Sequence, residues 1–66
     1  MKITAADIRI QDGRASMRVT LEDGSEQDAI AWFVDELTFT PDDAIGRTVE
    51  QLCTLQFERD RAYLQS

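Results

Sequence analysis

Apolar and polar residues alternate along the first third of the chain, as they do in strands that bury one face. Ile8 and Ile10 alternate with polar neighbours, and a second alternating run follows, whose apolar members are Ala15, Met17, Val19 and Leu21. Asp12-Gly13 and Asp23-Gly24 are dipeptides that supply the positive φ angles of tight hairpin turns. The pattern therefore predicts a β meander with two tight turns.

The two turns predict one consistent register. A two-residue loop at Asp12-Gly13 sets Ile10 opposite Ala15, and a two-residue loop at Asp23-Gly24 sets Ala15 opposite Trp32. Both loops gather the same residues on one face of the sheet: Ile8, Ile10, Ala15, Met17, Ile30 and Trp32. Phe33 then lies on the outer face, beside Arg14. The alternative is that Ser25 caps a helix over residues 26–37, with Ile30, Phe33, Val34 and Leu37 as its apolar stripe.

The second half of the chain is helical in pattern. Thr40-Pro41-Asp42-Asp43 places a cap residue before a proline, and Gly46 can end this short turn. Thr48-Val49-Glu50-Gln51 fits the capping-box pattern and opens a helix that runs to about Leu64. Its apolar face is predicted to comprise Val49, Leu52, Cys53, Phe57, Tyr63 and Leu64. Residues 1–66 are thus expected to form one small α+β domain, a three-stranded antiparallel meander packed against a C-terminal helix.

Two polar residues interrupt this helical face. Gln56 and Asp60 both fall near the middle of the apolar arc, four residues apart. A carboxylate buried there is costly without hydrogen bonds or a cationic partner. Asp60 is therefore expected to bind backbone or an arginine, or to be exposed by a rotation of the helix; otherwise this part of the helix faces a partner.

Positive charge is missing from the middle of the chain. No Lys or Arg lies between Arg18 and Arg47, and the total net charge is −6. Eight carboxylates lie in this window: Glu22, Asp23, Glu26, Asp28, Asp35, Glu36, Asp42 and Asp43. They are either ordinary solvated charge at turns and caps, or a contact surface for a basic partner that imitates the phosphates of a nucleic acid. Because the chain is acidic, it is not expected to bind nucleic acid or membranes directly.

The composition argues against most chemistry. With no His and one Cys, the chain can form neither an intrachain disulfide nor an ordinary zinc site. Acid–base catalysis by adjacent acids such as Asp35-Glu36 requires a pocket, and nothing in the sequence suggests one; the window also lacks calcium-loop spacing. Cys53 is expected to be a small buried hydrophobe. We therefore predict a protein that is not an enzyme, needs no cofactor or metal, and works in a reducing cytoplasm, since Met1 is not followed by a basic and apolar leader.

The whole chain resembles the small acidic proteins with which phages and mobile elements block bacterial defence, including anti-CRISPR and anti-restriction proteins. Its length, missing His and acidic window match that type. The resemblance implies a stoichiometric inhibitor, active in a bacterial host cell, that occupies a basic nucleic-acid channel of an effector, with the eight acids as contacts. Residues 19–24 and 29–33 are also similar to a hairpin of uncharacterised bacterial domains found beside toxin–antitoxin genes, although the proline expected after Phe33 is missing.

Two binding modes follow from the sequence. In the first, the acids bind a basic surface of a nucleic-acid-binding protein, and salt weakens the complex. In the second, the chain is an antitoxin-like or accessory module that binds through an apolar and aromatic face around Phe33. Either edge strand, Ile8–Gln11 or Ile30–Val34, could also pair with a second copy of the chain.

Overall fold

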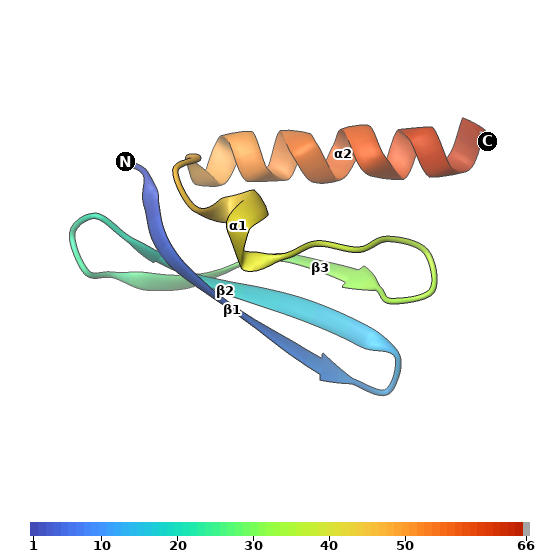
Figure 1. The fold of residues 1–66 in the computed structure, drawn as a ribbon, viewed down its shortest axis with the longest axis horizontal. Coiled ribbons are helices and arrows are strands. Elements are labelled where there is room, and N and C mark those ends of the chain that lie inside the picture. Colours follow the sequence, from blue (N-terminus) through green and yellow to red (C-terminus); the bar gives the residue numbers. More distant parts are fainter. Residues whose placement is uncertain (66) are drawn as a thin grey trace.

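The computed structural model describes residues 1–65 and confirms the α+β fold. Its strands β1 (Ile3–Gln11), β2 (Arg14–Leu21) and β3 (Glu26–Phe33) form one antiparallel sheet in the order β1-β2-β3. The short helix α1 (Pro41–Ala44) and the long helix α2 (Val49–Gln65) lie on one face of this sheet (Figure 1). The segment that could have been a helix is therefore a strand as far as Phe33.

The first hairpin has the predicted register. Ile10 lies opposite Ala15 and Ile8 opposite Met17, and both turn residues have positive φ angles, 54° at Asp12 and 78° at Gly13. These angles define the two-residue turn whose twist matches that of paired strands. The strand itself begins earlier than the alternation suggested, at Ile3.

The second turn differs from the prediction, yet the predicted central register is correct. Leu21 N–H donates to the Ser25 carbonyl at 2.8 Å, and Gly24 has φ 86°, so the loop has three residues, 22–24. A bulge in β3 at Ala29 compensates for the longer loop, because Met17 pairs with Ile30 while Arg18 pairs with Asp28. Ala15 therefore still lies opposite Trp32.

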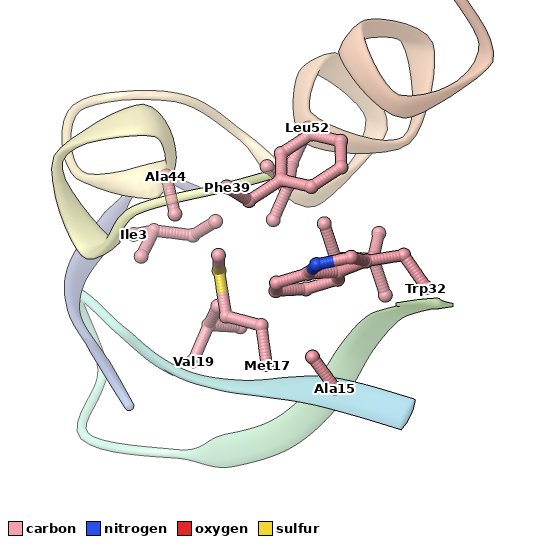
Figure 2. Packing of buried hydrophobic residues seen from close by; sticks show 9 residues of the cluster. Ile3, Ala15, Met17, Val19, Trp32, Phe39, Ala44 and Leu52 are labelled. Atoms are coloured by element: carbon pink, nitrogen blue, oxygen red, sulfur yellow. The ribbon is translucent and has the colours of Figure 1, made fainter. Parts of the chain in front are cut away.

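The core lies between the sheet and the helices (Figure 2). Its buried side chains are Ile3, Ala15, Met17, Val19, Ile30, Trp32, Phe39, Ala44 and Leu52. The Phe39 ring packs on Trp32 with 4.8 Å between centroids. Ile10 shares the inner face of the sheet but is 67 % exposed. The β1–β2 hairpin runs away from the helices, which therefore do not cover its tip (Figure 1).

Helix α2 begins as predicted but packs on a different face. Thr48 N–H donates to Gln51 Oε1 at 2.9 Å, and Gln51 N–H donates to Thr48 Oγ1 at 3.1 Å, which completes the capping box. Leu52 is fully buried, whereas four members of the predicted apolar face are exposed: Cys53, Phe57, Tyr63 and Leu64. The prediction that Cys53 is buried is wrong.

The rotation of α2 follows from its polar contacts. Arg59 lies over the Phe39 ring, 4.6 Å from the centroid, and the Gln56 amide donates to the Ala31 carbonyl at 2.6 Å. Both residues are half-buried, so the inner face of the helix contains polar side chains and turns Phe57 outward. Asp60 is exposed, in line with the expectation of a rotated helix. Among residues 1–65, no helix has the length and apolar character needed to cross a membrane.

Candidate protein-binding surface

Asp43, one of the eight candidate acids, is part of the framework of the fold. Both of its carboxylate oxygens accept hydrogen bonds from the Arg59 guanidinium, each at 3.1 Å, and Oδ2 also accepts from Thr40 N–H at 2.8 Å. The side chain of Asp43 is 24 % exposed. Hydrogen bonding from Arg59, helped by Thr40, lowers the pKa of this carboxyl. Asp43 therefore carries little free charge for a partner.

Asp23 and Glu22 have local partners in the β2–β3 loop. Asp23 Oδ1 accepts from the Ser25 hydroxyl at 2.6 Å and from the Ser25 N–H at 3.0 Å. Both hydrogen bonds lower the pKa of Asp23, and the bond from the Ser25 hydroxyl has the larger effect. Glu22 Oε1 accepts from the backbone N–H of Lys2 at 3.0 Å. Both residues are exposed and keep some capacity to bind, but their first role is to shape the loop.

The five remaining acids are exposed and fall at separate places. Glu26 and Asp28 lie at the start of β3, Asp35 and Glu36 follow its end, and Asp42 lies in α1. Within residues 1–65 the Asp43–Arg59 pair is the one ion pair. An eight-residue strand spans about 23 Å, so the two acidic pairs lie at opposite ends of β3. The candidate acids do not form a single patch.

An exposed aromatic side chain lies between these two pairs. Phe33, the last residue of β3, is 55 % exposed on the outer face of the sheet, opposite Arg14, and the next residue, Val34, is exposed too. We call this surface the β3 margin and define it by six residues: Glu26, Asp28, Phe33, Val34, Asp35 and Glu36. The placement of Phe33 on the outer face near Arg14 agrees with the sequence-based prediction.

The β3 margin borders two hollows. The larger, of about 890 Å³, lies over the outer face of the sheet and has small residues in its lining, such as Ser16 and Ala31. Three arginines, Arg9, Arg14 and Arg18, also line it, together with Asp28 and Phe33. The smaller, of about 300 Å³, lies between the end of β3 and α2 and is lined by Phe33, Glu36 and Asp60, among others. Phe33 thus stands at the edge of both.

The side chains that surround the two hollows are of three main kinds: carboxylates, arginines and the Phe33 ring. Cys53 lies on α2 and lines neither hollow. Within residues 1–65, no three His, Cys, Asp or Glu side chains come together in a way that could hold a metal ion. The surface combines an exposed aromatic ring with arginines, two kinds of residue that are enriched at protein interfaces, and with carboxylates, which are not.

Sequence reasoning missed one exposed feature, the outer side of α2. Phe57 is 66 % exposed and Leu64 is 75 % exposed, although both had been placed on the buried face. The signal that could have corrected this was present in the sequence, because Gln56 and Asp60 occupied the centre of the supposed apolar arc. Comparison with known proteins gave no match to this chain, whether among family models, curated proteins or solved structures.

Proposed function

We propose that this protein is a non-enzymatic binding module that occupies a basic surface of another protein through its β3 margin. The observation that carries the proposal is the position of Phe33, an exposed ring on a rigid strand with free acidic pairs at both ends of that strand. Aromatic anchors supply most of the binding energy at interfaces, and surrounding charges steer association and select the partner.

The partner class that we favour is a nucleic-acid-handling protein, such as an effector of bacterial defence. Grooves that hold nucleic acid present arginine and lysine side chains along a phosphate path, on which duplex DNA places about one charge per 1.7 Å. Acidic pairs at the two ends of a strand about 23 Å long can meet two separate parts of such a groove. The protein then inhibits by excluding the nucleic acid, and Phe33 fills an apolar site between the charged contacts.

The test is a pull-down from bacterial lysate at low and high salt, followed by affinity measurement with the protein recovered. The double variant Glu26→Lys/Asp28→Lys should abolish binding at physiological salt, and Phe33→Ala should weaken it at least about tenfold. The matched control, Glu50→Lys/Glu58→Lys, changes the net charge equally on exposed positions of α2 and should bind normally. The partner's own nucleic acid should displace the protein.

Full binding by both β3 variants would refute the β3 margin as the contact surface. Binding that resists high salt and is not displaced by nucleic acid would instead favour the second candidate, an antitoxin-like or accessory module. That candidate has one specific observation in its favour, the exposed Phe57 and Leu64 on α2. Phe57→Ser/Leu64→Ser should then remove binding, whereas the Lys variants of β3 should not.

A further inference from the structure

Strand β1 has a free edge. It pairs with β2 on one side, and within residues 1–65 no other strand pairs with its opposite side beyond an isolated bridge between Lys2 and Thr48. At its start the edge is occupied, because Ile3 N–H donates to the Arg47 carbonyl at 2.7 Å and Gly46 N–H donates to the Ile3 carbonyl at 2.9 Å. The free part therefore extends from about Ala5 to the turn at Asp12.

The turn determines which peptide groups point to this edge. In a two-residue hairpin the flanking residues, Gln11 and Arg14, exchange both hydrogen bonds, and bonded and non-bonded pairs then alternate along the strands. Arg9 and Asp7 thus bond to β2, while the N–H and C=O groups of Ala6, Ile8 and Ile10 point away from it. The same alternation, carried across β2, places the Ala31 carbonyl on the free edge of β3, where Gln56 binds it.

The side chains along this edge alternate between two kinds. Ala6, Ile8 and Ile10 lie on the inner face of the sheet, and Ile10 is uncovered by the helices. Asp7 and Arg9 lie on the outer face, opposite Arg18 and Ser16 of β2. The edge thus combines open backbone groups, an apolar row and two opposite charges spaced two residues apart. Proteins ordinarily protect so long an edge.

We propose that β1 pairs antiparallel with β1 of a second copy, about a two-fold axis at Ile8. When the two-fold axis is perpendicular to the sheet, the inner faces of both copies lie on the same side, so residues that pair directly must belong to the same face. Residues of one face are an even number of positions apart, and the axis therefore passes through a residue that pairs with its own copy. Pairing at Asp7 opposes two carboxylates, and pairing at Arg9 opposes two guanidiniums. Pairing at Ile8 sets Ile8 opposite its copy, Ala6 opposite Ile10, and Asp7 opposite Arg9 twice, so it is the register with complementary charge.

The length of the free edge selects the same register. Ile8 is the midpoint of residues 5–11, so Ala5 pairs with Gln11 of the second copy. The second copy's turn at Asp12 then lies beside Thr4, just before the part of the edge that residues 46–48 occupy. The outer face then carries Asp28, Arg18, Asp7 and the second copy's Arg9 in one row of alternating sign. The result is a six-stranded sheet in which each exposed Ile10 side chain packs beside Ala6 of the second copy. This inference does not depend on the proposed function.

The test is sedimentation of the full chain at protein concentrations from about 1 µM to 1 mM, with the wild type compared with variants in which the charges at positions 7 and 9 are changed. The wild-type protein should shift from the 7.5 kDa monomer to a dimer. Asp7→Arg and Arg9→Asp should each weaken the dimer about tenfold or more, because each converts both cross-strand pairs to like charges. The double variant Asp7→Arg/Arg9→Asp should restore it. Glu58→Arg, which changes the charge as Asp7→Arg does but at an exposed site on α2, should leave dimerisation unchanged.

A second variant tests the backbone pairing. Ile10→Pro removes an N–H that points to the free edge and not to β2, so the fold should persist, as judged by circular dichroism, while the dimer is lost. A wild-type protein that is monomeric throughout the range would overturn the proposal. So would a dimer that ignores both single charge changes, or a charge exchange that fails to restore association. Should a single variant unfold, the comparison of wild type with the double variant and Ile10→Pro still decides.

Discussion

At the scale of single residues, Asp43 shows how the fold uses a charge that the sequence had suggested for binding. Asp43 lies in α1 and joins it to two other segments, because Thr40 belongs to the connection before α1 and Arg59 lies in α2. Asp43→Asn removes the negative charge, and we expect the free energy of unfolding at pH 7 to fall by about 1–2 kcal/mol, a range that allows for the partial exposure of the pair. Urea unfolding followed by the fluorescence of Trp32, the single tryptophan, measures it.

The stability that Asp43 contributes should depend on pH in a defined direction. The folded state lowers the pKa of Asp43, so the stabilisation is present above the unfolded value of about 3.9 and is lost as pH falls through the lower folded value. The wild type and Asp43→Asn should therefore converge in stability once the pH falls below the lowered folded pKa of Asp43. Asp42→Asn is the matched control, since Asp42 is an exposed neighbour in the same helical turn. An equal loss in both variants, or a difference that persists at low pH, would contradict the role assigned to Asp43.

At the scale of elements, α2 is held to the sheet by few side chains. Leu52 is its one fully buried residue within the described chain, and beyond Gln56 the helix contributes Arg59 to the interior but exposes Phe57. Leu52→Ala should lower the free energy of unfolding by about 3 kcal/mol, within the range for truncation of buried leucines. Phe57→Ala should change it by less than about 0.5 kcal/mol. Thermal and urea unfolding distinguish the two, and comparable losses would mean that α2 packs as the sequence pattern suggested.

The strands could be predicted from the sequence because two independent signals agreed. Period-2 alternation and the Asp-Gly turns gave the register at Met17 and Ala15, and the extra loop residue at 22–24 was offset by the bulge at Ala29. The helix face could not be predicted in the same way. Phe39 lies in a connecting segment without periodicity, yet it packs on Trp32 and receives Arg59, and this contact sets the rotation of α2.

The candidate site could be predicted only in part, for the same reason. Charge counting identified the acids, but hydrogen bonding decides which of them are free. Asp43 and Asp23 have partners that depend on the folded positions of Arg59 and Ser25. The exposure of Phe33, in contrast, follows from strand alternation and was predictable.

At the scale of the whole molecule, the protein has a net charge of −6, and among residues 1–65 one ion pair alone, Asp43–Arg59, joins opposite charges. Repulsion among the exposed acids therefore opposes folding, and added salt screens it. We expect the melting temperature to rise by about 5 °C between roughly 10 mM and 500 mM NaCl, equivalent to about 1 kcal/mol for a domain of this size. Glu50→Lys/Glu58→Lys lowers the net charge from −6 to −2 and should show a smaller rise.

The same salt should act on folding and on binding with opposite signs. It stabilises the monomer by screening repulsion within the chain, and it weakens the complex by screening attraction between the β3 margin and a basic partner. Loss of binding at high salt then cannot be caused by unfolding, because the protein is more stable there. Differential scanning calorimetry and affinity measurements over one salt series test this together. A melting temperature that falls or stays constant as salt rises would show that repulsion among the acids does not limit the stability of this fold.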